Sequence, residues 1–314
     1  MTDLKPVRRQ LSPWTVAFGL LFVTLFSFQL IGPFIGMAIA YPLYDGKPMD
    51  FIGDIADPTG NEQMKMLLMI IQGSGTLFGL VIIPTLFRNA IKHEPALSLF
   101  KGHDVRPIYF LMTIGIVITF LGPGSVIMQW NQNIDFPDGA FERWAKGLEE
   151  QLGEFTKYMT SFNSFGEYLS GVLVMAILPA FGEEMVFRGM IQPEFQKSFK
   201  NVHVGIWVSA IIFSAFHLQF YGFVPRALLG ALFGYLYYWS GNLYVPIFAH
   251  FINNWFAVSL IYFGLSDVPG FEEENTTAMP WYAVAVLTTL CGFLIYRFRM
   301  GLSNRTLAND VSAQ

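Results

Sequence analysis

The chain alternates long apolar stretches with short polar segments, and eight of the apolar stretches predict helices that cross a membrane. A spanning helix needs about 20 mostly apolar residues. The predicted spans are Trp14–Tyr41, Met66–Phe87, Ile108–Met128, Phe165–Phe187, Val204–Phe220, Arg226–Trp239, Leu243–Phe263 and Trp281–Phe298. The sixth is short and begins with an arginine, so we expect it to extend into flanking residues or to be shielded by neighbouring helices.

A second kind of periodicity occurs in the loop before the fourth span. Its apolar residues recur at three- and four-residue spacing with charges between them: Phe141, Trp144, Ala145, Leu148, Leu152, Phe155 and Met159. This spacing predicts an amphipathic helix over about 140–160 that lies at the outer interface of the membrane. A surface helix packed on the bundle and a lid or substrate-guiding helix both fit this pattern.

Composition supports lipid as the solvent of this chain. Its 314 residues are 53% hydrophobic and only 13% charged, whereas soluble domains carry roughly 25% charged residues. The expected fold is therefore an all-α integral membrane bundle of about eight transmembrane helices with one interfacial amphipathic helix. The net charge of −4 argues against a nucleic-acid partner, which would require clustered Lys and Arg. The single cysteine, Cys291, cannot form an internal disulfide or a paired-cysteine metal site.

The basic residues divide the loops into two sets, which predicts the orientation in the membrane. One set holds Lys5, Arg8, Arg9, Arg88, Lys92, Lys101, Arg106, Lys197, Lys200, Arg297, Arg299 and Arg305, and the other holds Lys47, Arg143, Lys146, Lys157 and the acidic loops, among them Glu272–Glu274. Eight spans with both termini cytoplasmic satisfy this pattern, and a bacterial inner membrane is the expected location.

The order of these segments predicts four parts. Residues 1–130 form a scaffold of three membrane helices, and 131–164 form the outer loop with the amphipathic helix. Residues 165–263 form a core of four membrane helices, and 264–314 form the last membrane helix and a cytoplasmic tail.

Ionisable and amide side chains occur inside the predicted spans of the second half of the chain. Such groups are costly in a bilayer and are therefore candidates for function. They are Glu183, Glu184, Arg188, His217, Arg226, His250, Asn253 and Asn254. Glu184 and Arg188 are four residues apart and can form an ion pair on one helix face. His250 and Asn254 have the same spacing and can address one ligand together.

These groups are expected at similar depths. If the fourth helix continues and turns near Lys200, Glu183 lies 17 residues before the turn and His217 lies 17 residues after it. Both are then about 25 Å from that turn, given a rise of about 1.5 Å per residue. The next hairpin turns near Gly241. Arg226 lies 15 residues before that glycine. His250 lies 9 residues after it and Asn254 lies 13 residues after it.

Two kinds of chemistry suit this set. A carboxylate and an imidazole can activate water as a nucleophile, and a histidine with an asparagine can stabilise a developing oxyanion. Glu and His are also zinc ligands, and Glu183, His217 and His250 could form a three-ligand site. No HExxH or GxSxG motif is present.

The spacing of the same residues resembles the CAAX-protease and bacteriocin-processing family of intramembrane glutamate endopeptidases, the type II CAAX prenyl protease-like proteins. Glu183-Glu184-Met-Val-Phe-Arg188 is similar to its EExxxR motif, Phe213-Ser-Ala-Phe-His217 to FxxxH, and His250-Phe-Ile-Asn-Asn254 to HxxxN. The resemblance covers about residues 165–260. It implies that Glu183 and His217 activate water, that His250 and Asn254 stabilise the oxyanion, and that Glu184 and Arg188 form a supporting ion pair.

The leading hypothesis is an intramembrane endopeptidase that hydrolyses a peptide bond of a membrane-embedded or lipidated substrate. It requires no cofactor, although a zinc-dependent variant is an alternative. A proton-coupled transporter and a non-catalytic scaffold or immunity factor are further alternatives.

Overall fold

The computed structural model describes residues 11–134, 136, 139–265 and 277–312, and side chains to residue 302. The described chain is helical and contains no strand. Its helices are α1 (Pro13–Phe26), α2 (Gly32–Ala40), α3 (Pro48–Ala56), α4 (Met64–Thr76), α5 (Ile83–Lys92), α6 (Pro107–Gln132), α7 (Ala140–Thr160), α8 (Phe165–Gly171), α9 (Leu178–Glu184), α10 (Gln192–Phe199), α11 (Val202–Ala215), α12 (Phe223–Ser240), α13 (Tyr244–Tyr262) and α14 (Trp281–Ser312).

Within the described residues, six continuous helical segments are long and apolar enough to cross a membrane, so the chain is a multi-pass membrane protein. They are Pro13–Leu43, Met64–Lys92, Pro107–Gln132, Phe165–Phe199, Tyr244–Tyr262 and Trp281–Leu302. The other two predicted spans are also helices, α11 and α12. The expectation of an all-α membrane bundle is confirmed, and the helix count is close to that expected.

The fifth predicted span, Val204–Phe220, extends beyond the end of the observed helix. Helix α11 ends at Ala215, and the chain from Phe216 to Gly222 forms a loop in which Leu218 adopts a left-handed backbone with φ of 56°. His217 therefore lies in a turn rather than within a helix. The sixth predicted span does extend into its flanks, because α12 runs from Phe223 to Ser240.

Three of the long helical segments contain wide π-helical turns, four in all, and each turn is followed by a proline. The turns are Ser27–Ile31 (η1), Leu77–Ile82 (η4), Val172–Ile177 (η6) and Met185–Ile191 (η7), and the prolines are Pro33, Pro84, Pro179 and Pro193. A proline has no N–H, and its ring collides with the carbonyl four residues earlier. In each case the residue before the proline donates its N–H five residues back, so the wider turn makes room for the ring.

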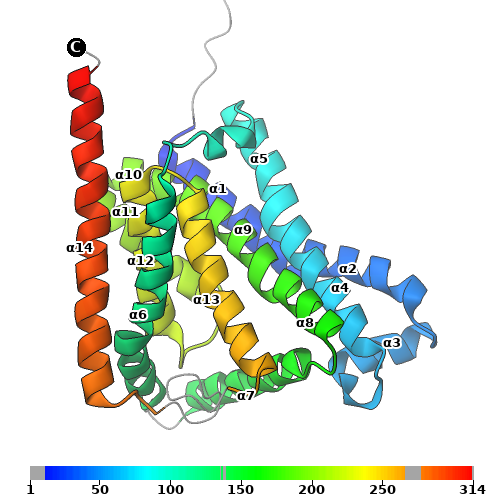
Figure 1. Cartoon of the computed structure of the whole chain (residues 1–314). Helices are drawn as coiled ribbons and strands as arrows, with labels where there is room; N and C mark the ends of the chain where they lie inside the picture. The colour runs from blue at the N-terminus through cyan, green and yellow to red at the C-terminus, as the bar shows by residue number, and fades with distance from the viewer. Residues whose placement is uncertain (1–10, 135, 137–138, 266–276, 313–314) are drawn as a thin grey trace, which may run out of the picture.

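The two hairpins turn where the sequence predicts. Lys200 has a left-handed φ of 51° between α10 and α11, and Gly241 has a φ of 58° between α12 and α13. Asn201 caps α11 by accepting hydrogen bonds from the N–H groups of His203 and Val204. These turns bring α9, the end of α11, α12 and α13 together in the interior of the bundle (Figure 1).

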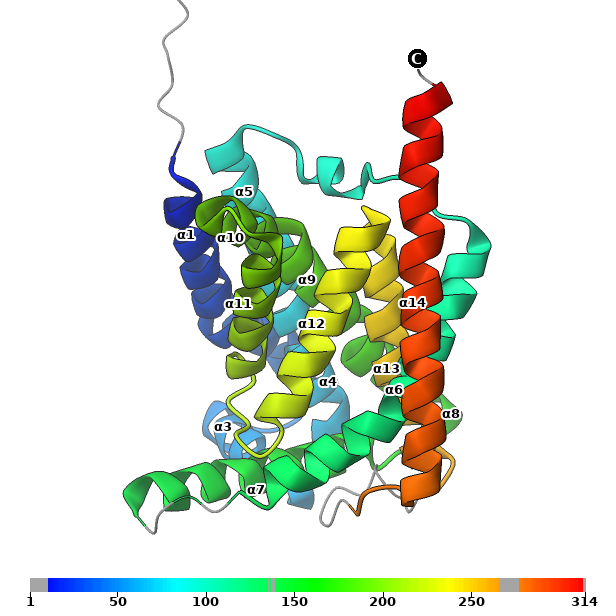
Figure 2. The ribbon, with the colours of Figure 1, turned by 90° about the vertical axis from the view of Figure 1, so that its left-hand side faces the viewer.

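Helix α7 lies across one end of the bundle, transverse to the membrane helices (Figures 1 and 2). Its Ala145 and Met159 are buried against the bundle, whereas Phe141 and Trp144 contact Phe220 of the α11–α12 loop. The predicted amphipathic helix over 140–160 is present.

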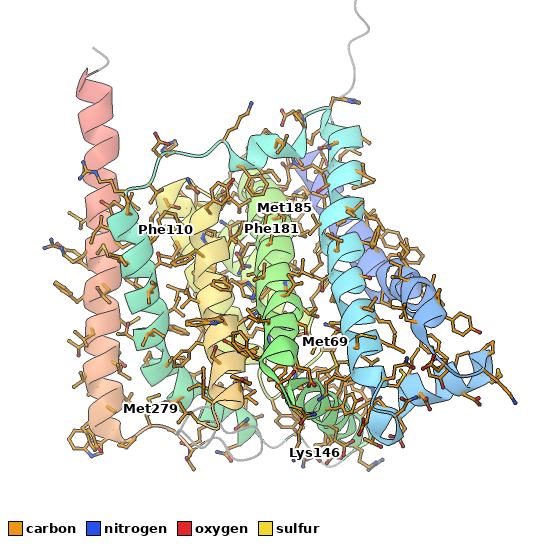
Figure 3. All side chains as sticks on the ribbon, turned by 45° about the vertical axis from the view of Figure 1, so that its right-hand side comes forward. Met69, Phe110, Lys146, Phe181, Met185 and Met279 are labelled. Carbon is orange, nitrogen blue, oxygen red and sulfur yellow. The ribbon has the colours of Figure 1, made fainter. Side chains whose placement is uncertain are left out.

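The remaining helices frame the interior. Helix α14 packs along α6 at one edge, and α1 packs against η7 through Val16 and Leu20. In Figure 3, Phe181 and Met185, which flank Glu183 and Glu184, lie inside the bundle, while Lys146 of α7 lies at its end.

The start of α1 and the end of α14 lie at the same end of the bundle, opposite α7 (Figure 1). This arrangement agrees with eight passes. The compartment that this end faces stays a prediction. Lys5, Arg8, Arg9 and Glu272–Glu274 lie outside the described residues, as does the side chain of Arg305.

Close packing of the first two long segments depends on glycines. A Cβ on Gly79 would overlap the Phe28 backbone, and Ser27 donates its hydroxyl to the Gly79 carbonyl at 2.8 Å. Small residues allow membrane helices to approach this closely.

We therefore expect Gly79→Ala to lower the free energy of unfolding by about 1–3 kcal/mol, the usual cost of overpacking. Unfolding of the purified protein in mixed micelles measures the change. Gly292→Ala is the matched control, because a Cβ on Gly292 meets nothing within 4 Å. Equal stability of the two variants would contradict the packing argument.

Candidate active site

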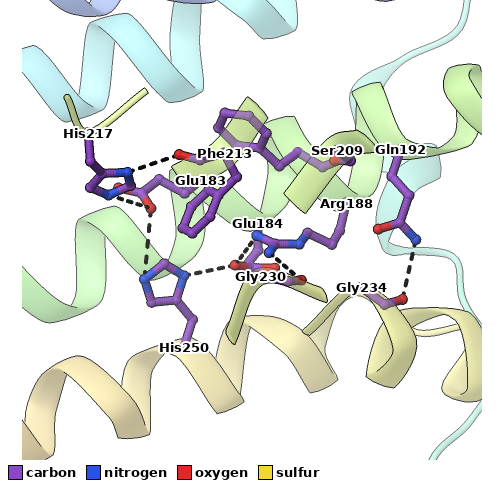
Figure 4. A network of polar contacts seen from close by, with 11 residues as sticks. Glu183, Glu184, Arg188, Gln192, Ser209, Phe213, His217, Gly230, Gly234 and His250 are labelled. Carbon is purple, nitrogen blue, oxygen red and sulfur yellow. Dashed lines mark hydrogen bonds and ion pairs between the residues drawn. The ribbon is translucent and has the colours of Figure 1, made fainter. Parts of the chain in front are cut away.

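Five of the predicted site residues meet in the interior of the bundle. Glu183 and Glu184 end α9, and Arg188 lies in the π-helical turn η7 that follows. His217 reaches them from the loop after α11, and His250 from α13. Figure 4 shows the contacts that join these side chains.

Glu184 and Arg188 form a buried ion pair. Glu184 Oε1 lies 2.6 Å from Arg188 Nη1, and the two side chains are 0% and 1% exposed. Arg188 also donates from Nη2 to the Gly230 carbonyl at 2.8 Å, and its guanidinium carbon lies 4.7 Å from the centre of the Phe213 ring. The guanidinium thus neutralises Glu184 and ties α9 to α12, and the predicted pairing is present.

His250 lies between the two carboxylates. Its Nδ1 is 2.8 Å from Glu184 Oε1, and its Nε2 is 3.8 Å from Glu183 Oε2. An ionised carboxylate only accepts hydrogen bonds, so we assign the proton of Nδ1 to this contact. The ring also stacks on Phe233 with a centroid distance of 5.4 Å. Glu184 and Phe233 therefore hold His250 with Nε2 directed towards Glu183.

His217 is arranged in the same way from the opposite side. Its Nδ1 is 3.0 Å from the carbonyl oxygen of Phe213, which can only accept, so Nδ1 is the donor. Its Nε2 lies 4.0 Å from Glu183 Oε2. The His217 side chain is 32% exposed, compared with 6% for His250, so it lies on the open side of the site.

Glu183 is the unpaired member of the group. Its Oε2 is buried and has no hydrogen-bond partner among the described residues, and both imidazole Nε2 atoms are beyond direct hydrogen-bond distance. In neutral imidazoles with Nδ1 protonated, each Nε2 is an acceptor. Three acceptors therefore face one another, and a water molecule between them would supply the missing donors.

Asn254 lies one helical turn beyond His250 and makes other contacts. Its Nδ2 donates to the Met175 carbonyl at 3.2 Å, and its Oδ1 accepts from Asn253 Nδ2 at 3.1 Å. These bonds join α13 to the π-helical turn η6. Among the described residues, the Asn254 amide makes no hydrogen bond to Glu183 or to either imidazole, so its suggested role at the oxyanion stays a prediction.

A three-ligand metal site formed by Glu183, His217 and His250 was an alternative hypothesis from the sequence. Within the part of the chain that the structure describes, no group of three or more His, Cys, Asp or Glu side chains is arranged to hold a metal ion. The distances of 3.8 and 4.0 Å from Glu183 Oε2 to the two Nε2 atoms exceed the separation of about 3.4 Å implied by tetrahedral zinc with bonds of about 2.0–2.2 Å.

Two glycines of α12 contribute to the site and were not identified from the sequence. Arg188 and Gln192, four residues apart, donate to the carbonyls of Gly230 and Gly234, which are also four apart. A Cβ on Gly230 would lie 3.2 Å from Arg188 Nη2, and one on Gly234 would lie 2.7 Å from Gln192 Oε1. The Gly230-xxx-Gly234 spacing was visible, but such spacing occurs often by chance in membrane helices.

Asn131 at the end of α6 is a second residue that sequence reasoning missed. It donates from Nδ2 to the Phe220 carbonyl at 3.0 Å and accepts from the Val224 N–H at 2.7 Å. It thereby fixes the α11–α12 loop that carries His217.

A separate cleft of about 1030 Å³ lies between α4 and the α8–α9 segment. Polar residues such as Lys65 and Glu167 line one end, and apolar residues line the other as far as Leu178, five residues before Glu183. The cleft does not include any of the predicted site residues.

Three comparisons with known proteins bear on this site. Residues 165–256 match the family model described as type II CAAX prenyl endopeptidase Rce1-like. The uncharacterized protein YpbD of Bacillus subtilis is 28% identical over 160 residues, which are 50% of this chain and 69% of YpbD. "Putative membrane peptidase YdiL" of the same organism is 28% identical over 108 residues, 34% of this chain and 43% of YdiL. No solved structure matches this chain.

The matched segment contains every predicted site residue. It begins with α8 and ends within α13, and it includes the three motifs on which the resemblance was based. The resemblance to the CAAX-protease and bacteriocin-processing family is therefore confirmed over residues 165–256.

The buried ion pair generates a prediction about stability. Arg188→Met leaves Glu184 buried without its cation, so we expect a loss of about 3–5 kcal/mol in unfolding free energy. Combining it with Glu184→Gln should recover much of that loss, because no uncompensated charge remains.

Lys197→Met is the exposed control for the ion pair. Lys197 is 59% exposed, and its partner Glu194 keeps Lys92 at 2.9 Å, so we expect a change below about 1 kcal/mol. Unfolding in mixed micelles measures the stability of Arg188→Met, of the double variant and of Lys197→Met relative to the unsubstituted protein. A double variant no more stable than Arg188→Met would show that charge compensation is not the cause.

Proposed function

We propose that this chain is an intramembrane endopeptidase in which Glu183 and His217 activate water. The observation that carries the proposal is the buried Glu183 Oε2, which lacks a partner and faces two imidazole Nε2 atoms at 3.8 and 4.0 Å. The Rce1-like match over residues 165–256 and the similarity to YdiL support an intramembrane protease.

The first step forms the tetrahedral intermediate. A water between Glu183 and His217 gives a proton to the Glu183 carboxylate while its oxygen bonds to the carbonyl carbon of the substrate. The π electrons of that carbonyl move onto its oxygen, which becomes the oxyanion. General-base catalysis of this kind typically contributes about 10²–10⁴-fold to the rate.

The second step expels the amine. Glu183 returns the proton to the peptide nitrogen as the C–N bond breaks, which yields a carboxyl product and an amine and restores the carboxylate. His250, when protonated on both nitrogens, would donate from Nε2 to the oxyanion. Asn254 can join it as a donor only by giving up its bond to the Met175 carbonyl.

The substrate class follows from where the site lies. Glu183 lies between Phe181 and Met185 in sequence, and both of these are inside the bundle of membrane helices (Figure 3), so a peptide bond must reach Glu183 from within or beside the bilayer. We propose a membrane-embedded or lipidated peptide or protein as the substrate, and a bacterial inner membrane with cytoplasmic termini as the location. Residues 165–263 act as the catalytic core, and 1–130 and 264–314 support it.

Substitutions at Glu183 and His217 test the proposal. With the purified protein and a fluorogenic apolar peptide, we expect Glu183→Gln and His217→Ala each to reduce kcat at least 100-fold, because each removes a group that activates water. Glu150→Gln and His203→Ala are matched controls on exposed residues and should retain activity. Unchanged kcat in both site variants, with folding intact, would refute the mechanism.

Treatment with a chelator distinguishes the proposed mechanism from the zinc-dependent alternative. We expect activity to persist after prolonged treatment with a strong chelator, and metal analysis of the treated protein should find no bound zinc. Loss of activity that added zinc restores would instead establish the zinc-dependent form of the protease.

A further inference from the structure

Arg226 is a partly buried cation that the proposed mechanism does not use. It lies in the first turn of α12 and donates from Nη2 to Gln219 Oε1 at 2.6 Å. Its Nη1 is buried and has no hydrogen-bond partner among the described residues. An unpaired donor on a buried guanidinium is costly, which indicates that a partner joins it in the working protein.

The geometry of the α11–α12 loop holds this guanidinium in place. Gln219, which binds Nη2, lies two residues after His217. Gly222 lies beneath the guanidinium, because a Cβ there would be 3.2 Å from Nη2 and 3.7 Å from Nη1. The loop that carries His217 into the site thus also positions Arg226.

Two carboxylates, Glu149 and Glu183, interact electrostatically with Arg226 without forming an ion pair with it. The nearest connection runs through Gln219, whose Nε2 lies 3.5 Å from Glu149 Oε1 on α7. Burial raises the pKa of the Glu149 carboxyl, and the Arg226 charge opposes that rise. Arg226 also interacts electrostatically with Glu183. In the described part of the chain, no carboxylate lies within ion-pair distance of Arg226, so Nη1 stays without a partner there.

We propose that Arg226 binds a carboxylate of the peptide substrate and so forms a specificity subsite next to Glu183. A guanidinium binds a carboxylate through its N–H donors, and Nη1 supplies a donor that the described residues leave unpaired. A monoanion fits better than a phosphate, because Glu149 and Glu183 already place negative charge nearby.

The subsite rests on the proposed function, since it assumes a peptide substrate. Its carboxylate has two sources, the free C-terminus of the peptide or an acidic side chain near the cleaved bond. A role of Arg226 confined to holding α7 or to stabilising the charge of Glu183 would affect all peptides equally. The charge of the substrate therefore distinguishes recognition from these structural roles.

The experiment measures peptide binding and cleavage separately. Fluorescent apolar peptides are made as a free acid, as a C-terminal amide, and as an amide with one internal Asp or its Asn counterpart. Binding is measured by fluorescence anisotropy with the full-length Glu183→Gln protein, so it does not depend on cleavage. Cleavage by the protein with native Glu183 gives KM and kcat for the same peptides.

We expect one carboxylate-bearing peptide to bind at least about tenfold more tightly than its neutral twin, as a charge-assisted hydrogen bond would provide. Arg226→Gln should abolish this difference while leaving the neutral peptide nearly unchanged, and Arg226→Lys should retain part of it. The free-acid pair and the Asp/Asn pair show which source of carboxylate is used.

Two further variants control for folding and charge. Gly222→Ala crowds the guanidinium without removing it, and it should reduce the preference for the acid peptide. Arg143→Gln removes an exposed arginine of α7 and should preserve the preference.

A preference that survives Arg226→Gln, or a loss of equal size for charged and neutral peptides, would overturn the subsite. Absence of cleavage with charge-dependent binding intact would instead refute the peptidase mechanism alone.

Discussion

The ion pair between Glu184 and Arg188 is the constraint on which the rest of the site depends. Charges removed from water must be paired and hydrogen-bonded, or the fold loses several kcal/mol. Arg188 satisfies this requirement by contacting Glu184 on its own segment, the Gly230 carbonyl on α12 and the ring of Phe213 on α11. Glu184 also binds His250 on α13. One buried pair therefore determines how four segments of the chain meet.

These segments can pack closely because two positions of α12 are glycines, which have no side-chain atoms. Gly230 and Gly234 leave room for Arg188 and Gln192 to reach the backbone of α12. The π-helical turn η7, between Glu184 and Pro193, changes the register of the helix, so that Arg188 and Gln192 both face α12 despite the proline. Wide turns of this kind are frequent at functional sites, and here a proline accounts for the wide turn.

Two adjacent glutamates have received different environments. Glu184 accepts from both Arg188 and His250 through Oε1. Glu183 has the two imidazole Nε2 atoms nearby but no direct partner for Oε2. Carboxylates that differ in this way can take different roles in one reaction. The ordered pair orients His250, and in the proposed mechanism the unpaired carboxylate exchanges a proton with water.

The sequence by itself determined the membrane bundle, the interfacial helix over 140–160, the turns at Lys200 and Gly241, and the pairing of Glu184 with Arg188. These follow from apolar length, periodicity and four-residue spacing, which are local properties of the chain. The grouping of Glu183, His217 and His250 was also predicted, because antiparallel hairpins convert distance from a turn into depth.

Only the tertiary structure decided which atoms face one another. Four features depend on how separate helices pack. They are the end of α11 at Ala215, the contact of Asn254 with the Met175 carbonyl, the anchoring of the His217 loop by Asn131, and the Arg226 Nη1 that has no partner among the described residues. Helical spacing gives the depth of a residue and its neighbours on the same helix. Rotation about the helix axis and contacts between helices are set by side chains far apart in the sequence, such as Phe213, Gly230 and Phe233, which become neighbours only when the bundle has formed.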